Sequence, residues 1–580
     1  MNYDKLSPTL ASAFTDFQEE GRFGLPRHTG TIGTASVEPG IKPARVVVFL
    51  HCDEGLRADA FANLGVELNS PQGSLRTGIV PFDALDQLSE DPGVHRIVPA
   101  RALNPLMDVA KEKVGVNAFR ASSGLSGKGV IVGAVDTGID ITNIHFTRRV
   151  LRIWDQTMGG TGVPEGGYGA ELKGRQLRNS QDKVGHGTHV SGIAAGADEN
   201  YLGVAPKAEI IMVKSDLLTA HIADGIRYVF RVAREMNRPA VVNLSLGGHG
   251  DSHDGTDPLS QIIDQETGPG RIVCCAAGNE GNDNIHAQVV VRKGSTRTVA
   301  ITIPRPPAGQ TAPMATFNGW YSGGDQMDVA VVPPEGGQTP WQGVITGGSP
   351  TKTYNTPFGA VRVITPGPDP ANGDINFFVQ IQLAPNAPTT PKPNNWKLRL
   401  RGQKVTKGGR VDVWVVAGLT EFTGAAVKDS MKVGSPGASS SAITVGAYTT
   451  KVDWVDFFGN AHHAGFDLDD ISDFSSEGPR RDGGEKPDVA APGAMIVSAM
   501  SAHAPTPQAM MVDDMNRAMV GTSMACPFVA GVVALLLERD PGLDPAKCKD
   551  LLREVSAIPG KKAGAFDPKW GYGLLDAAGL

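Results

Sequence analysis

Ser523 opens an apolar stretch that predicts a buried helix, and its hydroxyl could serve as a nucleophile. The stretch covers residues 521–538 and reads GTSMACPFVAGVVALLLE. A serine before an apolar run most often only caps the helix. The unpaired N–H groups and positive dipole end at a helix start also favour developing negative charge. Because proline is tolerated in a first helical turn, we expect Pro527 to lie there.

His186 is the candidate base for such a nucleophile. It lies between two glycines in GHGTHVSGIAAG, residues 185–196, at the start of a helix of small residues. Glycine on both sides lets the backbone approach another element closely and leaves the imidazole uncrowded. His189 follows three residues later, so a metal-binding pair is an alternative. Because no glutamate follows in the H-E-x-x-H manner, acid–base chemistry is the favoured interpretation.

Asp136 could orient that histidine. It ends the apolar strand of GVIVGAVDTGID, residues 129–140. A single aspartate before a glycine more often only forms a turn. In open α/β sheets, however, functional groups gather at the carboxyl ends of strands. A serine becomes a nucleophile when a histidine takes its proton and an aspartate holds the imidazolium, so the three motifs support one another.

Composition describes a globular protein of several domains. The chain has 580 residues, of which 40% are hydrophobic and 20% charged, with a net charge of −7. This balance favours neither a nucleic acid nor a membrane as partner. The five cysteines are an odd number and include the adjacent pair Cys274 and Cys275, which indicates reduced thiols. No signal peptide or membrane-spanning stretch is recognised, so we expect a cytoplasmic protein.

The pattern of apolar residues changes along the chain. Residues 45–98 alternate strands with two helical stretches, 56–65 and 81–91, which indicates a small α+β unit. From 129 onward, apolar strands alternate with helices, as in a parallel sheet covered on both faces. Between 283 and 430, short alternating strands separated by Pro/Gly-rich turns indicate an inserted antiparallel β-sandwich.

The chain resembles the subtilisin-like serine proteases, or subtilases, whose chain order is also Asp, His, Ser. The matching stretches are AVDTGID, GHGTHVSGIAAG, NLSLGG (243–248), AAGNEG (276–281), KPDVAAPG (486–493) and GTSMACPFVAG. They span residues 110–580 outside the insert, and the G-x-S-x-G of α/β-hydrolases is missing. With the RVLRIWDQT stretch (149–157), the N-terminal unit and the insert, the chain resembles the clostridial germination-type (Csp) subtilases more closely.

This resemblance implies an α/β fold with a subtilisin-like parallel sheet and helices on both faces. It adds an N-terminal α+β propeptide domain and a jelly-roll-like inserted β-sandwich. The expected segments are the N-terminal tail and propeptide (1–104), the two parts of the catalytic domain (105–282 and 431–580) and the insert (283–430). The insert could be a rigid brace, a substrate exosite or an oligomer contact, of which we favour the brace. The oligomeric state is left open.

The resemblance also implies a serine endopeptidase. Asp136, His186 and Ser523 would form its catalytic triad, and the Asn279 amide and Ser523 N–H its oxyanion hole. The alternative is a catalytically silent relative that binds and regulates a partner. A binding scaffold has no need of all four residues, so the enzyme is favoured.

The substrate implied is an extended protein or peptide strand. The walls and floor of its first pocket would be Ser245, Leu246, Gly247, Ala276, Ala277, Gly278 and Gly434. A glycine floor without an acidic residue in these segments favours a large neutral side chain, such as Leu, Met, Phe or Tyr, before the cut bond. Cleavage after Arg or Lys should be poor.

Two positions depart from the calcium-binding pattern of many subtilases. His145 stands where an aspartate is usual, and the loop after the His186 helix is only ADENYLG, residues 197–203. We expect Asp198 and Glu199 in that loop to be solvated. The sequence therefore predicts no tight calcium site of the usual kind and no cofactor.

The N-terminal domain would act as inhibitor and chaperone, with its last strand in the active-site cleft. A gapless match to the family's mature start places the cut at Asn104–Pro105. That bond is a poor substrate because proline restricts the preceding residue and its nitrogen is hard to protonate. We therefore expect either an uncut chain or a cut shifted to follow Leu103 or Leu106.

Overall fold

The computed structural model describes residues 2–28, 32, 34–36, 44–69, 73–99, 104–105, 112–304, 314–384 and 395–580. Its backbone divides into two compact units. One unit contains residues 1–102, 249–252 and 283–429, and the other contains 103–248, 253–282 and 430–580. The N-terminal segment and the insert thus fall in the same unit.

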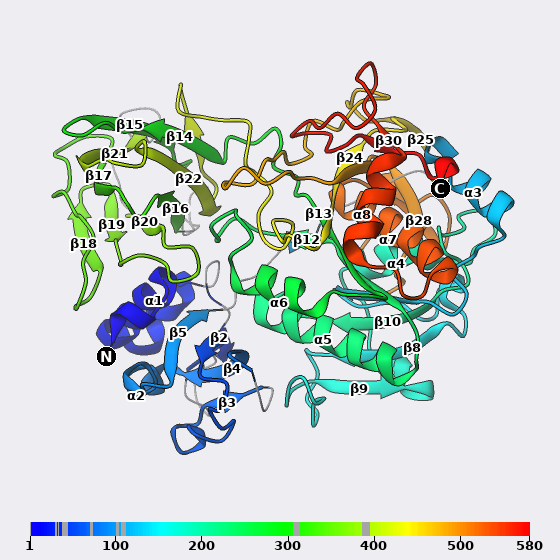
Figure 1. Cartoon of the computed structure of the whole chain (residues 1–580), viewed down its shortest axis with the longest axis horizontal. Helices are drawn as coiled ribbons and strands as arrows, with labels where there is room; N and C mark the ends of the chain where they lie inside the picture. The colour runs from blue at the N-terminus through cyan, green and yellow to red at the C-terminus, as the bar shows by residue number, and fades with distance from the viewer. Residues whose placement is uncertain are drawn as a thin grey trace. The chain divides into compact units, whose positions relative to one another are not determined.

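The larger unit is built on a ten-stranded mixed sheet (Figure 1), in the order β30-β31-β27-β24-β13-β11-β7-β10-β8-β9. All neighbours from β8 to β31 pair in parallel, whereas β9 and β30 at the two edges pair antiparallel. The strands are β7 (Ile131–Asp136), β8 (Val150–Asp155), β9 (Ala170–Lys173), β10 (Glu209–Lys214), β11 (Ala240–Leu244), β13 (Arg271–Ala276), β24 (Ile443–Tyr448), β27 (Val489–Pro492), β30 (Ser556–Ala557) and β31 (Leu574–Leu575).

Helices cover both faces of this sheet, as predicted. Alternate residues of β7 show this, since Val132 belongs to the core that contains α7, whereas Gly133 lies against Val229 of α5. The helices α4 and α7 contact each other on one face, and α5 and α6 on the other. Their bounds are α3 (Val116–Ser123), α4 (His186–Ala195), α5 (Thr219–Glu235), α6 (Pro258–Glu266), α7 (Thr522–Arg539) and α8 (Pro545–Glu554).

Among the helices that the structure describes, only α7 is long and apolar enough to cross a membrane. It is 89% buried within its unit, where it packs against the central strands. Its composition is therefore that of a core helix. The same unit also contains the short strands β6 (Asn104–Pro105), β12 (Leu246–Gly247), β25 (Asp453–Val455), β26 (Ala461–His463), β28 (Ile496–Ala499) and β29 (Asn516–Met519).

The N-terminal part of the smaller unit is an antiparallel sheet with two helices. Its elements are α1 (Pro8–Glu20), β1 (Thr34–Ser36), β2 (Arg45–Cys52), β3 (Glu67–Leu68), β4 (Leu75–Pro81), α2 (Leu85–Glu90) and β5 (Val94–Pro99). The predicted helix over 56–65 is wrong, because only the single 3-10 turn Ala62–Leu64 forms there. Turns of three residues close by backbone bonds such as Ala60 N–H to the Arg57 carbonyl, and Gly65 ends them in a left-handed conformation.

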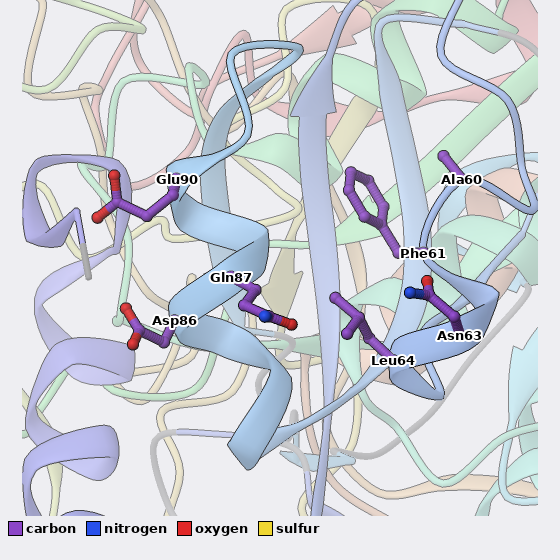
Figure 2. A pocket seen from close by; sticks show the side chains of 7 residues that line it. All are labelled: Ala60, Phe61, Asn63, Leu64, Asp86, Gln87 and Glu90. Atoms are coloured by element: carbon purple, nitrogen blue, oxygen red, sulfur yellow. The ribbon is translucent and has the colours of Figure 1, made fainter.

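An open groove of about 520 Å³ lies between this turn and α2 (Figure 2). Phe61 and Leu64 line one side, and Gln87 of α2 points toward them. Asp86 and Glu90 of α2 also line the groove, and in this view their side chains extend away from Phe61 and Leu64. The groove brings together no nucleophile and base.

The insert forms two antiparallel sheets around one apolar core. Six strands make one sheet, namely β14 (His286–Val290), β16 (Ala315–Tyr321), β18 (Thr351–Thr356), β19 (Gly359–Ile364), β20 (Ile375–Leu383) and β22 (Arg410–Ala417). Four make the other, β15 (Thr296–Thr302), β17 (Gln326–Val332), β21 (Asn395–Lys404) and β23 (Glu421–Thr423). Strands β14, β16, β18 and β23 were not predicted from the sequence.

Helix α1 contacts strands β18 and β20 of the insert (Figure 1). Buried polar groups join them: Ser12 Oγ donates to Gln380 Oε1 at 2.7 Å, and the Arg362 guanidinium binds both carboxylate oxygens of Asp16. A second ion pair joins Arg96 of β5 to Asp369, with N···O distances of 2.5 and 2.7 Å. The N-terminal domain and the insert therefore share a charged, partly buried interface.

We predict that Arg362→Leu destabilises the smaller unit. Although burial opposes ionisation, hydrogen bonds from His28 and Arg362 lower the pKa of Asp16 from 3.8 to about 2. Removing one partner of a buried ion pair costs about 3–5 kcal/mol, because the other charge stays buried. Urea unfolding at pH 7 should show this loss. The carboxylate's stabilisation is present above about pH 4 and is lost toward pH 2, so the difference between wild type and variant should shrink across that window.

The matched control is Arg297→Leu on β15. Arg297 is exposed, and its one described hydrogen bond goes to the neighbouring Thr296 carbonyl. Its loss should change the unfolding free energy by no more than about 0.5 kcal/mol. Equal effects of the two substitutions would show that the Asp16–Arg362 pair is not a significant source of stability.

Candidate active site

Asp136 and His186 form a buried pair at the carboxyl edge of the sheet. Asp136 is the last residue of β7, and His186 is the first residue of α4. The His186 Nδ1 atom lies 2.7 and 2.9 Å from the two Asp136 oxygens, and each residue is only 1% exposed. The carboxylate holds the proton on Nδ1, which leaves Nε2 as the basic nitrogen of the neutral ring.

Ser523 is fixed by a reciprocal contact with Ser245, the residue that follows β11. The Ser523 hydroxyl donates to the Ser245 carbonyl at 3.0 Å, and the Ser245 hydroxyl donates to the Ser523 carbonyl at 2.6 Å. Ser523 is the second residue of α7 and is fully buried. Since β11 neighbours β7 in the sheet, Ser523 and Asp136 are positioned at adjacent strand ends.

The expectation that Pro527 lies in the first helical turn is wrong. The helix α7 begins at Thr522, so Pro527 is its sixth residue and lies inside it. At that position a backbone N–H would normally bond the Ser523 carbonyl, four residues earlier. Proline has no N–H, and this carbonyl instead accepts the Ser245 hydroxyl.

The side chain of Asn279 is oriented by Thr522. Its Oδ1 accepts hydrogen bonds from the Thr522 N–H at 2.9 Å and the Thr522 hydroxyl at 3.0 Å. Since a backbone N–H can only donate, the atom facing Thr522 is the amide oxygen, and the NH₂ group points elsewhere. The Ser523 N–H lies in the first turn of α7, where helical N–H groups lack partners within the helix. These two donors suit an oxyanion beside Ser523.

The segments predicted to form the first pocket also converge. Gly248, directly after β12, donates its N–H to the Ser435 carbonyl at 3.0 Å, which brings 245–248 beside 434–435. A Cβ on Gly437 would lie 3.1 Å from the Ala276 carbonyl oxygen, and Gly278 bonds the Thr522 hydroxyl. Of the predicted pocket residues, Ser245 and Gly278 bond the start of α7 directly, and the segments that carry Leu246, Gly247, Ala276, Ala277 and Gly434 are joined to one another by these contacts.

One carboxylate near this floor was not predicted. Asp257 accepts a hydrogen bond from Ser435 Oγ at 2.8 Å, next to Gly434. It also caps α6 by accepting the N–H groups of Leu259 and Ser260. Its charge is therefore stabilised by the helix end and a hydroxyl. The sequence does not show that Asp257 is near Gly434, because the two residues are far apart in the chain and meet only in the folded structure.

Asp182 is a second residue that sequence reasoning missed. It is fully buried, and its two oxygens accept five hydrogen bonds of 2.7 to 3.1 Å. The donors are the Thr137 hydroxyl, the Val184, Gly185 and Thr188 N–H groups and the Thr188 hydroxyl. Asp182 thus joins the residue after Asp136 to the first turn of the His186 helix. Its place four residues before His186, ahead of a helix start, was the available signal.

The structure gives His186 and His189 different contacts. His189 Nε2 lies 3.0 Å from the Arg517 carbonyl, and burial lowers the pKa of His189 well below its usual value. Within the described residues, no group of three His, Cys, Asp or Glu side chains is placed to hold a metal ion. The two histidines thus face different partners, Asp136 for His186 and the Arg517 carbonyl for His189.

The calcium-related positions are occupied by other contacts. His145 Nε2 lies 2.8 Å from Asn516 Oδ1, and the Arg149 guanidinium donates to the carbonyls of His145 and Ala208. The expectation that Asp198 is solvated is wrong: it is 7% exposed, and its carboxylate accepts the N–H groups of two following residues. Glu199 is exposed as expected.

The fold is an α/β sheet with helices on both faces, and its carboxyl edge brings Asp136 to His186 and holds Ser523 at the neighbouring strand end. The family model described as "Subtilase family" matches residues 127–356 and 384–573, which is more than half of the chain. The chain therefore belongs to the subtilase family, and the resemblance found in the sequence is confirmed.

Individual relatives match shorter parts. The serine protease AprX of Bacillus subtilis is 38% identical over 22% of this chain and 27% of its own length. The major intracellular serine protease of the same organism is 28% identical over 33% of this chain and 56% of its own. The chain thus spans from about a quarter to just over half of these relatives.

Among solved structures, the CspB protease of Clostridium perfringens matches over most of both chains. It covers 80% of this chain and 97% of its own, with a TM-score of 0.65 and 25% sequence identity. The likeness to Csp subtilases inferred from the sequence is therefore also found in the structure.

We predict that Asp182→Asn lowers kcat without raising KM. An amide has one acceptor oxygen and one NH₂ group. The donors that now bond one of the two Asp182 oxygens would therefore face an NH₂ group, which cannot accept their hydrogen bonds. The resulting displacement of the Asp136 and His186 backbones should cost about tenfold to a hundredfold in kcat. KM should be unchanged, since the five donors to Asp182 all belong to the segments that carry Asp136 and His186.

Asp198→Asn is the matched control, because within the described ranges only one oxygen of Asp198 accepts hydrogen bonds, and an amide oxygen can replace it. Steady-state kinetics on a chromogenic peptide would compare the variants. A rise in KM with unchanged kcat in Asp182→Asn would contradict a positioning role.

Proposed function

We propose that this protein is a serine endopeptidase that hydrolyses protein substrates through Asp136, His186 and Ser523. The observation that carries the proposal is the arrangement at one sheet edge. The buried Asp136–His186 pair follows β7, and Ser523 is locked to the residue after the neighbouring strand β11. The family membership of the chain supports the same activity.

The proposed reaction follows from the hydrogen bonds. The Ser523 hydroxyl turns from the Ser245 carbonyl to His186 Nε2, which takes its proton as Oγ attacks the substrate carbonyl. Asp136 stabilises the imidazolium that results. The Asn279 NH₂ and the Ser523 N–H hold the oxyanion. His186 then protonates the leaving amine, and water hydrolyses the acyl-enzyme by the reverse proton transfers.

We propose a large neutral side chain before the cut bond. The segments 245–247, 276–278 and 434 that would contact it contribute no charged side chain. Asp257 lies behind Ser435, where it is already engaged by three donors. All three bonds are to Oδ1 of Asp257, so the proposed preference rests on the uncharged segments 245–247, 276–278 and 434.

The N-terminal domain is proposed to be the propeptide of this enzyme, and the insert to be a brace. Their shared ion pairs, Asp16–Arg362 and Arg96–Asp369, support a brace for the N-terminal domain in particular. The free, buried state of all five cysteines fits a reducing compartment, in keeping with the predicted cytoplasmic location.

A fluorophosphonate probe tests the activity. We predict that the wild-type chain is labelled and cleaves casein, and that Ser523→Ala does neither. Asn279→Ala should lose about a hundredfold to a thousandfold in kcat, because one oxyanion donor is removed. Asn282→Ala is the control, since Asn282 is exposed and bonds only Asp473 in the described part of the chain. A wild type that is not labelled would favour the regulatory binding protein.

The family's usual tight calcium site is proposed to be replaced by Arg149. Calcium needs a shell of oxygen ligands that carry negative charge. Here two backbone carbonyls that could face a cation instead accept bonds from the Arg149 guanidinium. Burial lowers the pKa of Arg149 to about 10, so it remains a cation at neutral pH. The residues present therefore do not fit calcium at this position.

We predict that thermal stability does not depend on calcium. A ligand present at a hundred times its Kd stabilises by about 2.7 kcal/mol, which raises Tm by several degrees. Melting in 1 mM EDTA and in 1 mM CaCl₂ should give the same Tm within about one degree. Arg149→Met should lower Tm equally in both buffers. A clear rise in the wild-type Tm with calcium would show that a site exists.

A further inference from the structure

A cavity of about 420 Å³ lies within the smaller unit, between α1 and the insert. Three acidic residues of α1, Asp16, Glu19 and Glu20, line one side of it. The other side is the outer face of the six-stranded sheet, where Arg362 of β19 and Gln380 of β20 lie opposite each other. The volume is in the range typical of ligand-binding sites. None of these residues belongs to the proposed catalytic site.

The one basic residue among those that line the cavity, Arg362, is already paired. Its guanidinium binds both oxygens of Asp16, and the same carboxylate lies 2.7 Å from His28 Nε2. Glu19 is exposed and takes part in no ion pair among the described residues. Its carboxylate therefore adds negative charge that Arg362 does not balance.

The position of the carboxylates in α1 strengthens their preference for a cation. Glu19 and Glu20 are the last two residues of the helix, and its last turn contains no basic residue. The negative end of the helix dipole lies there, which disfavours carboxylates and favours positive charge. A cation in the cavity would interact favourably with the carboxylates and with the helix end. The α1 side therefore selects a positively charged group.

The sheet side of the cavity offers hydrogen-bond donors instead. The Ser12 hydroxyl accepts a bond from Arg362 at 2.7 Å and donates to Gln380 Oε1 at 2.7 Å, which orients the amide and leaves Nε2 on its other side. Gln380 is only 1% exposed, and its Nε2 has no hydrogen-bond partner among the described residues. The same holds for Nε of Arg362. Because buried donors are almost always paired, these two atoms indicate an acceptor on a bound molecule.

We propose that this cavity binds a basic segment of a partner protein. An arginine or lysine side chain of the segment lies against Glu19 and Glu20, and a backbone carbonyl of the segment accepts the hydrogen bond of Gln380 Nε2. A peptide carries both groups on neighbouring atoms. A polyamine has the positive charge but no acceptor, whereas an anion has acceptors but is repelled by the carboxylates. The proposal does not depend on the proposed peptidase activity.

Calorimetric titration of the full-length Ser523→Ala chain tests the proposal, since a peptide cannot be cut by it. The probe is a capped peptide, acetyl-Gly-Arg-Gly-Arg-Gly-amide. We expect saturable binding of one peptide per chain. The affinity should fall as NaCl is added, because salt screens the attraction between charges near the surface. The same peptide with glutamate in place of arginine should not bind.

Substitutions in the same chain locate the site. Glu19→Lys should weaken peptide binding by at least about threefold, because an attraction between exposed charges becomes a repulsion. Glu335→Lys is the matched control, since Glu335 is an exposed carboxylate of the same unit and is not among the residues that line the cavity. It makes the same change in net charge and should leave the affinity unchanged. Gln380→Leu should weaken binding by about threefold to tenfold, because a hydrogen bond is lost.

Spermidine, a polyamine without an acceptor, tests the role of the donors. It should bind more weakly than the peptide, and Gln380→Leu should not change its affinity. Spermidine binding as tight as that of the peptide would overturn the assignment to a peptide. Equal affinities of Glu19→Lys and Glu335→Lys, or no saturable binding of the arginine peptide, would overturn the site. Where Gln380→Leu lowers Tm, the exposed Glu19 and Glu335 pair decides the outcome.

Discussion

The reciprocal hydrogen bonds between Ser523 and Ser245 hold the start of α7 against the sheet, and one of them takes the place of a helical N–H that Pro527 lacks. Pro527 leaves the Ser523 carbonyl without its helical donor, and the Ser245 hydroxyl takes that place at 2.6 Å. A buried carbonyl without any donor would cost about 1–3 kcal/mol. The contact therefore couples a helix-breaking residue to the placement of the nucleophile and of the strand that a peptide would join.

A second constraint is that two carboxylates, those of Asp136 and Asp182, are buried near His186 and need hydrogen-bond donors there. Asp136 bonds His186 directly, and Asp182 is satisfied entirely by hydroxyl and backbone N–H groups. Four of those five donors lie before or within the first turn of α4, where the dipole favours an anion. His186 begins the same helix, so the Asp182 charge offsets the positive end that would otherwise disfavour an imidazolium.

The sequence was sufficient for features that are local. Asp136, His186 and Ser523 each lie at an element end, and the structure brings Asp136 to His186 and Ser523 to the neighbouring strand end. The parallel sheet was predictable because strands such as β7 are apolar on both faces. The roles of Asp182 and Asp257 could not be predicted, because each depends on contacts between elements that are distant in the sequence.

Other failures have simple physical causes. Strand β16 is buried at all seven positions, so its residues ATFNGWY show no alternation of polar and apolar side chains. Residues 56–65 carry apolar side chains at helical spacing, but their backbone forms three-residue turns instead of an α-helix. The insert and the N-terminal domain each have an apolar core, and nothing in the sequence showed that 283–429 and 1–102 fall in one compact unit. The spacing of apolar residues predicts single helices and strands, but it does not show which of their surfaces pack together.

The contacts within the smaller unit determine which parts of the protein would stay together after a cut in the chain. Its N-terminal domain and insert are joined by the Asp16–Arg362 and Arg96–Asp369 ion pairs and by the Ser12–Gln380 hydrogen bond. All of these residues lie outside 103–111, so none of the contacts requires a continuous backbone there. Hydrolysis after Leu106, one of the two expected positions, would leave strand β6 joined to the N-terminal domain and separate it from the residues that follow, while the interface within the smaller unit would keep its own contacts. Whether β6 stays beside Ser245 would then depend on its pairing with β12. That pairing covers two residues of each strand and is far less extensive than the ion-paired interface.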